Sequence, residues 1–214
     1  MRPRRLVVVT GTGTEVGKTW VASALARRLV EAGRTVCARK PAQSFEHGDD
    51  GGAVTDAHVL GSATGEAAEV VCPHNRWYPV PMAPPMAAAS LGRGAPSLAE
   101  LVSEIESSWP GAAVDIGLVE GAGGVASPLG VDGDTADLAR ALGADSVLLV
   151  ADAGLGTINL VRMSVGALAP LPVTVYLNRF VTGDDLHEAN LRWLRERDRF
   201  DVVAAVADLA AAGM

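Results

Sequence analysis

The sequence has 214 residues, a length that fits one large domain, and we expect residues 1–214 to form a single domain. Hydrophobic residues make up 49% of the chain and charged residues 20%, a composition too apolar for a disordered protein. The 25 acidic against 18 basic residues give a net charge of −7, which argues against the broad basic surface of a nucleic-acid-binding protein.

Cysteine usage and hydropathy bear on where the protein works. The two cysteines, Cys37 and Cys72, have no paired spacing, which is typical of reduced thiols in a cytoplasmic protein. No segment approaches the roughly 20 uninterrupted apolar residues that a membrane-spanning helix requires. We therefore expect a cytoplasmic protein with neither a membrane nor a nucleic acid as its partner.

Short apolar runs rich in β-branched residues recur along the chain and predict strands that are buried on both faces. They are Leu6–Val9, Thr35–Ala38, Val114–Val119, Ser146–Ala151, Val173–Leu177 and, with a weaker pattern, Val202–Val206. Helical spacing occurs between or after them at Lys18–Glu31, Val54–Ala63, Leu98–Ser108, Thr135–Leu142, Ile158–Ala169 and Asp185–Arg197. This alternation predicts an α/β fold: a doubly wound, mostly parallel sheet with helices on both faces and a ligand site beyond the carboxyl ends of the strands.

The proline-rich segment Pro73–Pro96 interrupts this alternation. Proline lacks the backbone N–H that a central strand donates, so we expect a long ordered connection there and no central strand. A surface loop and a mobile lid fit the segment equally well, and a subunit or substrate surface is a third alternative.

The first predicted strand runs into a segment typical of a phosphate-binding P-loop. Residues 10–19 read TGTGTEVGKT and lead into an alanine-rich helix. In such a loop, backbone N–H groups cradle a triphosphate, Lys18 neutralises phosphate oxygens and the Thr19 hydroxyl ligates magnesium. Thr12 stands where the strict pattern has its first glycine, so the loop is a variant. The alternative is that Gly17, Lys18 and Thr19 only begin a helix.

Other polar residues follow predicted strands at the same edge of the sheet. Glu120 ends a buried strand before four residues rich in glycine, and its carboxylate suits magnesium, although a turn acid is the alternative. Lys40 emerges after the second strand, where it is either a site residue or a solvated charge. Asp56 is either a metal ligand or a helix cap. Asn178 follows the fifth strand and could pair with a purine or lie in a turn.

Taken in order, several motifs resemble the dethiobiotin synthetase family, over most of the chain. The motifs are Gly11–Thr19, Lys40–Ser44, Thr55–Ala57, Met82–Pro84, Val119–Gly124, Ser127–Leu129, Gly154–Asn159 and Leu177–Arg179. The positions that depart from the family pattern are Gly13, Phe45, Leu160 and Ala207.

The resemblance implies a role for each matching residue. Lys40 and Lys18 would be catalytic, and Thr19, Asp56 and Glu120 would surround magnesium. Nucleotide contacts would come from Glu15, Val16, Gly17, Lys18, Thr19, Trp20, Asp56, Glu120, Gly121, Ala122, Gly123, Asn178 and Arg179. Substrate contacts would come from Thr14, Ser44 and Asn159. The segment containing Asn159 resembles the dimer-contact region, where one subunit helps to hold the carboxylate tail of the substrate bound by the other.

Membership of this family would imply an enzyme, an ATP-dependent cyclo-ligase of biotin biosynthesis. Its substrates would be ATP, carbon dioxide and 7,8-diaminononanoate, with Mg²⁺ as cofactor and a homodimer as the assembly. The diamine and carbon dioxide form a carbamate, ATP phosphorylates it, and the second amine closes a cyclic urea with loss of phosphate. Such a reaction relies on positioning and charge neutralisation.

Two related P-loop functions remain as alternatives. An amidoligase of corrin biosynthesis would normally carry a glutaminase domain, for which this chain has no room. A partitioning or maturation ATPase that switches a partner protein usually carries a second lysine early in its phosphate loop, whereas positions 11–14 here read Gly-Thr-Gly-Thr.

Overall fold

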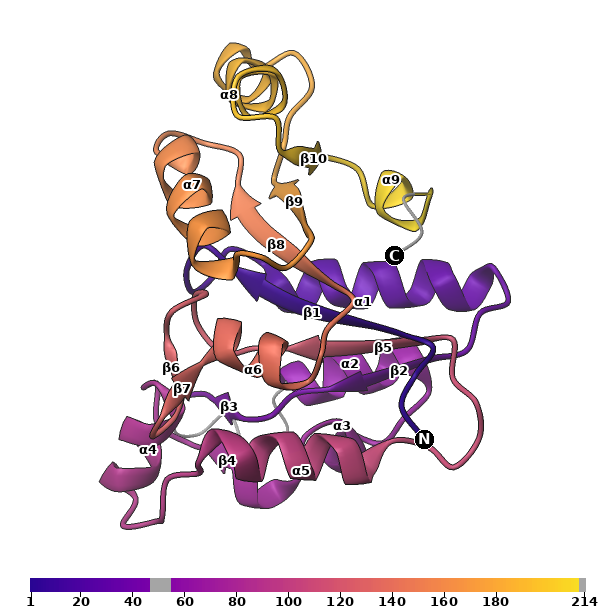
Figure 1. Ribbon diagram of the computed structural model, residues 1–214, viewed down its shortest axis with the longest axis vertical. Coiled ribbons are helices and arrows are strands. Elements are labelled where there is room, and N and C mark those ends of the chain that lie inside the picture. The colour runs from indigo at the N-terminus through magenta and orange to yellow at the C-terminus, as the bar shows by residue number, and fades with distance from the viewer. Residues whose placement is uncertain (47–54, 212–214) are drawn as a thin grey trace.

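The computed structural model describes residues 1–46 and 55–211 (Figure 1). This part of the chain contains a parallel sheet of six strands in the order β10-β9-β8-β1-β5-β2. The strands are β1 (Arg5–Gly11), β2 (Val36–Arg39), β5 (Ile116–Glu120), β8 (Ser146–Asp152), β9 (Val173–Asn178) and β10 (Asp201–Val203). The α/β class and the parallel sheet expected from the sequence are confirmed.

The central strand β1 explains why the apolar runs are continuous. Leu6 and Val8 pack into one core cluster, and Val7 and Val9 pack into another. Because successive side chains of a strand point to opposite faces, a strand covered on both sides needs apolar residues at every position. The sheet thus separates two apolar layers, each closed by its own helices.

One layer is formed by α1 (Lys18–Glu31), which contacts both α2 (Asp56–Thr64) and α9 (Val206–Ala211). The short helix α3 (Ala68–Val71) also packs on this side. The opposite layer contains α5 (Leu98–Ser108), α6 (Thr135–Ala141), α7 (Thr157–Leu168) and α8 (Asp185–Glu196). Figure 1 shows α8 and β10 at one end of the molecule and α4 and α5 at the other.

The proline-rich segment contains no strand of the central sheet, as expected. It holds a short 3₁₀ helix (His74–Arg76), β4 (Trp77–Tyr78) and α4 (Pro84–Ser90). Proline at the start of α4 is favourable because the first N–H groups of a helix have no partner within the helix. Strand β4 pairs in parallel with β3 (Gln43–Ser44), which brings this segment beside the chain that follows Lys40.

Four further observations complete the description of the fold. The strand predicted at Val202–Val206 is wrong at its end, because β10 stops at Val203 and Val206 begins α9, where Leu209 is buried against α1. The start of the predicted helix at Val54 lies outside the described residues. Strands β6 (Pro128–Gly130) and β7 (Gly133–Asp134) form an antiparallel pair. Within residues 1–46 and 55–211, no helix combines the length and hydropathy needed to cross a membrane.

Candidate active site

The P-loop connects β1 to α1 through backbone conformations that its sequence allows. Gly17 precedes α1 with φ +92°, and a Cβ there would lie 2.2 Å from the Asn178 amide nitrogen. Only glycine fits such a conformation and approach. The Lys18 ammonium donates a hydrogen bond of 3.1 Å to the Gly13 carbonyl, so the loop closes over this side chain. The loop and the first turn of α1 together have the shape of a phosphate site.

Lys40 and Glu120 lie side by side because β2 and β5 are neighbouring parallel strands. Arg39 pairs with Val119 in their register, so the next residue of each strand emerges at the same edge of the sheet. The Lys40 ammonium lies 2.6 Å from Glu120 Oε1, and both side chains are buried. This pair forms the floor of the site.

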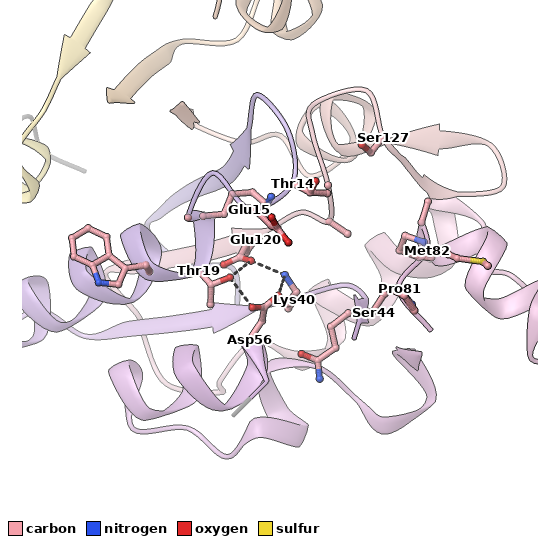
Figure 2. Close-up of a pocket in the computed structure, with 18 residues that line it drawn as sticks. Thr14, Glu15, Thr19, Lys40, Ser44, Asp56, Pro81, Met82, Glu120 and Ser127 are labelled. Carbon is pink, nitrogen blue, oxygen red and sulfur yellow. Dashed lines mark hydrogen bonds and ion pairs between the residues drawn. The ribbon is translucent and has the colours of Figure 1, made fainter. Parts of the chain in front are cut away.

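Asp56 and Thr19 complete the cluster from the first turns of α2 and α1. The Lys40 ammonium lies 2.8 Å from Asp56 Oδ2. The Thr19 hydroxyl lies 2.8 Å from Asp56 Oδ1 and 2.8 Å from Glu120 Oε1. Figure 2 shows the four side chains pointing toward one another. The structure thus brings these four predicted site residues together.

Charges in the cluster shift one another's pKa values. The Lys40 ammonium lowers the pKa of Asp56, and burial raises the pKa of Glu120. Burial alone would lower the pKa of Lys40, but the two carboxylates outweigh it and raise that pKa. Burial and the Lys40 charge lower the pKa of Lys18. Lys40 is thus firmly held as a cation, whereas burial makes the charged form of Lys18 less favourable than it is in water.

A cavity of about 570 Å³ opens above this cluster. It brings together predicted site residues from four parts of the chain: Thr14, Glu15, Gly17, Lys18, Thr19, Trp20, Lys40, Ser44, Asp56, Glu120, Ala122 and Gly123. The Ser44 hydroxyl oxygen is buried and has no hydrogen-bond partner within the described residues. A buried polar atom without a partner at a cavity wall is available to a ligand.

Other predicted site residues lie outside this cavity and support the P-loop. The Asn178 amide nitrogen donates a hydrogen bond of 2.9 Å to the Val16 carbonyl. The Arg179 guanidinium donates one of 2.8 Å to the Glu15 carbonyl and pairs with Asp152 at 2.9 Å. Asn178 is the last residue of β9 and Arg179 follows it, and both hold the loop from its outer side.

Two more predicted residues have different positions. Gly121 is buried, and a Cβ there would lie 2.5 Å from the Thr135 side chain, so its backbone lies too close to α6 for any larger residue. Asn159 is exposed on α7 and does not line the cavity. The described chain does not bring Asn159 to the other site residues.

Several cavity residues were not assigned a site role from the sequence. They are Gln43, Pro81, Met82, Ala83, Pro84 and Ser127. Met82, Ala83 and Pro84 belong to one of the motifs that resemble the family, and Gln43 lies within the Lys40–Ser44 motif. Membership of these motifs was the sequence signal that could have identified them as cavity residues. The proline-rich segment therefore contributes a wall of the cavity.

The residues around Lys40 fit a magnesium ion by their chemistry. The Thr19 hydroxyl lies 2.8 Å from an oxygen of each of the Asp56 and Glu120 carboxylates. Glu120 Oε2 is buried without a partner in the described part of the chain. Mg²⁺ usually takes one or two carboxylates, with phosphate and water oxygens in its remaining positions. No group of three or more His, Cys, Asp or Glu that could hold a metal occurs among residues 1–46 and 55–211. The donor set thus suits a metal that also binds a nucleotide.

Comparison with known proteins first defines the class. Residues 5–210 match a family model described as an AAA domain. A plasmid partition protein from Borrelia burgdorferi B31, solved bound to AMPPNP, is similar over 97% of this chain and 90% of its own, with a TM-score of 0.56 and 12% identity. Chloroplast FtsY from Physcomitrella patens is similar with a TM-score of 0.52 and 16% identity, and the chain spans 61% of it. These likenesses show the fold, that of a P-loop nucleoside triphosphatase.

Curated relatives then define the family. The chain is 40% identical over 215 aligned positions to the ATP-dependent dethiobiotin synthetase BioD of Anaeromyxobacter dehalogenans, covering 96% of this chain and 92% of that protein. It is 42% identical to the enzyme of the same name from Rhodococcus jostii, over 77% of this chain and 68% of that protein. The chain belongs to the ATP-dependent dethiobiotin synthetase family, and the family resemblance found in the sequence is confirmed.

Proposed function

We propose that this enzyme closes the cyclic urea of dethiobiotin from 7,8-diaminononanoate and carbon dioxide at the expense of ATP. The observation that carries the proposal is the position of Lys40, whose ammonium is held by Asp56 and Glu120 at the floor of a cavity that also contains the P-loop. A nucleotide-hydrolysing switch needs the P-loop, but it does not need a second buried cation facing a cavity with room for another substrate.

The proposed reaction has three steps with a simple balance of bonds. One amine attacks carbon dioxide, loses a proton and becomes a carbamate. A carbamate oxygen then attacks the γ-phosphorus of ATP, and ADP leaves. The second amine attacks the carbonyl carbon of the resulting mixed anhydride and loses a proton, phosphate leaves with the oxygen, and the ring closes. Both later steps join groups already held in one cavity, so proximity supplies much of the acceleration.

Lys18 and Lys40 supply the positive charge that these steps require. Lys18 would neutralise oxygens of the transferred phosphoryl group, as P-loop lysines do. Lys40 would face the anionic carbamate, since its contacts with Asp56 and Glu120 hold it charged at the same cavity. Preorganised charges of this kind stabilise a transition state more than water can, because they need not reorient during the reaction.

Both polar and apolar residues of the cavity are proposed to contact the diamine substrate. The unpartnered Ser44 hydroxyl and Thr14 would bind polar groups of the diamine. The apolar wall of Pro81, Met82 and Ala83 suits the aliphatic chain of such a substrate. Figure 2 shows Ser44, Pro81 and Met82 on the side of the cavity away from Thr19.

Nucleotide contacts are proposed for Glu15 through Trp20, together with Ala122 and Gly123 at the facing edge. Gly121, Asn178 and Arg179 remain predicted contacts, and the hydrogen bonds of Asn178 and Arg179 to the P-loop backbone support the assignment of those two residues. Thr19, Asp56 and Glu120 would hold Mg²⁺ with the phosphates. The metal would neutralise charge on the β- and γ-phosphate oxygens.

A homodimer and a cytoplasmic location complete the proposal. Leu155 is 91% exposed and Met163 is 70% exposed, and both lie beside Asn159 in the sequence. An exposed group of large apolar side chains is typical of a protein interface. Asn159 would then reach a partner subunit's substrate. Cys37 and Cys72 are both free and buried, which supports a reducing compartment.

The decisive experiment is an assay of the purified protein with ATP, Mg²⁺, bicarbonate and the diamine. We expect a product with the mass of the cyclic urea and ADP formation that depends on the diamine. A Lys40→Gln variant should bind ATP but turn over much more slowly. ATP hydrolysis that ignores the diamine and responds to a partner protein would instead indicate the switch ATPase.

A further inference from the structure

Gln43 is a buried residue of the cavity wall that the proposed mechanism does not use. It lies three residues after Lys40 in β3 and is 1% exposed. Its amide oxygen accepts a hydrogen bond of 3.1 Å from the Ala57 backbone N–H. Its amide nitrogen donates one of 3.3 Å to the Thr55 hydroxyl. The two residues that Gln43 contacts are the two neighbours of Asp56.

These contacts replace the usual cap of α2. Thr55 is the residue before the helix, where a threonine hydroxyl normally accepts a hydrogen bond from a first-turn N–H. Here the Thr55 side chain makes no such bond, because its hydroxyl contacts Gln43 and, at 2.9 Å, the His58 ring nitrogen Nδ1. Gln43 supplies the missing acceptor from another strand. The start of α2 is therefore tied to the segment that carries Lys40.

The position of the Asp56 side chain depends on these Gln43 hydrogen bonds more than the position of a fully buried side chain would. Its side chain is 42% exposed, whereas those of Lys40 and Glu120 are 3% and 1% exposed. Packing therefore confines the Asp56 carboxylate only in part, and its position also depends on the Ala57 backbone and the Thr55 side chain that Gln43 holds on either side. That position decides whether Asp56 can contact Lys40 and Thr19 together.

Further contacts support Gln43 from behind. Gln43 pairs with Trp77 in the β3–β4 ladder, and the His58 ring packs edge-on against the Trp77 ring at 5.6 Å between centroids. The hydrogen bond between the Thr55 hydroxyl and His58 Nδ1 connects this ring pair back to Thr55, which Gln43 also contacts. An amide held in this way has one orientation in which both of its hydrogen bonds can form.

We propose that Gln43 is a positioning residue, which places the Asp56 carboxylate for metal and Lys40 by holding the Ala57 backbone on one side of it and the Thr55 side chain on the other. The inference rests on the proposed role of Asp56 at the nucleotide site. Gln43 itself need not touch substrate or nucleotide. Its loss should therefore act only through Asp56, which separates positioning from a general loss of stability.

A double-mutant cycle with Gln43→Met and Asp56→Asn tests this. Methionine has a similar length but makes neither hydrogen bond. We expect Gln43→Met to lower kcat about tenfold, because displacing a contact by a fraction of an ångström has a cost of this order or greater. KM for ATP should change less. In calorimetric titrations, Gln43→Met should weaken binding of ADP with Mg²⁺ more than binding of ADP alone.

The cycle is evaluated on the affinity for ADP with Mg²⁺, so that it does not depend on residual activity. We expect Gln43→Met to weaken this affinity in the wild-type background and to change it less than twofold in the Asp56→Asn background. Equal losses in both backgrounds would show that Gln43 acts independently of Asp56 and would overturn the proposal. Absence of a cyclic urea from the wild-type assay would count against the proposed function alone.

A matched control comes from α5. Its Ser97 hydroxyl accepts a hydrogen bond of 3.2 Å from the Glu100 N–H, so Ser97→Ala removes a cap from a helix that carries no site residue. Ser97→Ala should lower Tm and leave kcat unchanged. If Gln43→Met does not fold, Thr55→Val removes one of the two contacts and should show the same selective loss of affinity for ADP with Mg²⁺, and its failure to do so would also overturn the proposal.

Discussion

The Lys40 ammonium and the Glu120 carboxylate lie 2.6 Å apart at the ends of neighbouring strands, with side chains that are 3% and 1% exposed. Removing two such charges from water costs several kcal/mol each, and close pairing offsets much of that cost. The fold therefore tolerates the two buried charges as a pair, whereas either charge alone would destabilise it. The pair lines the same cavity as the P-loop, so one interaction contributes both to the stability of the fold and to the proposed active site.

Lys40→Met should destabilise the fold by about 3 kcal/mol or more, because it leaves the Glu120 carboxylate buried without its nearest cation. Urea denaturation monitored by circular dichroism measures the free energy of unfolding. Adding Glu120→Gln to Lys40→Met should restore part of the lost stability, since the double variant buries no unpaired charge at Glu120. A double variant less stable than Lys40→Met alone would contradict this account.

Lys18→Ala should abolish detectable product and lower kcat at least about 10²-fold, because the developing charge on the transferred phosphoryl group loses its closest cation. The assay is cyclic urea formation followed by mass. The fold should remain, because the Lys18 ammonium contacts only the Gly13 carbonyl among the described residues. Near-normal activity would refute the assignment of this loop as the phosphate site.

Local patterns in the sequence predicted the strands of the sheet well. Leu6–Val9 reads as a strand buried on both faces because each of its residues is apolar, and the two core clusters show that both faces are indeed covered. At 202–206 the apolar pattern continued beyond the real strand, because Val206 is apolar as the start of α9 and not as part of β10. Apolar pattern alone does not separate these cases.

Contacts between distant residues were less predictable. Lys40 and Glu120 are 80 positions apart, and only the register of β2 against β5 brings them together. The hydrogen bond from Ala57 to Gln43 depends in turn on where β3 ends and α2 begins. Motif resemblance pointed to Lys40, Asp56 and Glu120. Gln43 lies in the same motif as Lys40, but its role is evident only from its contacts.

Lys18 should couple nucleotide binding to protonation at alkaline pH. Burial, and then the Lys40 charge, lower its pKa in the folded protein, so stability should rise as pH increases from that lowered value toward the unfolded lysine pKa of about 10.4. Phosphate oxygens favour the charged form, so nucleotide binding in that range should take up a proton. Titration calorimetry in buffers of different ionisation enthalpy detects the uptake, and Lys18→Gln should remove it.

Arg39 should prove structural despite lying next to Lys40. Its guanidinium is almost fully buried, pairs with Glu66 at 2.8 Å and donates hydrogen bonds of 2.6 Å to the Ser108 hydroxyl and carbonyl. Arg39→Met should therefore cost about 3 kcal/mol by leaving Glu66 without its cation. Urea denaturation should show this loss while KM for ATP stays unchanged at a temperature where the variant is folded. A raised KM with unaltered stability would reverse the assignment.

The exposed apolar group around Leu155 should hold the proposed dimer together. Leu155, Leu160 and Met163 are 91%, 46% and 70% exposed in the single chain, which leaves a large apolar surface in water. Leu155→Asp should shift the protein from dimer to monomer in size-exclusion chromatography with light scattering, because a carboxylate at an apolar interface loses its hydration. Val70→Asp, at another exposed apolar position, should leave the dimer intact. A wild-type protein that is monomeric at every concentration tested would remove the basis for a substrate contact by Asn159.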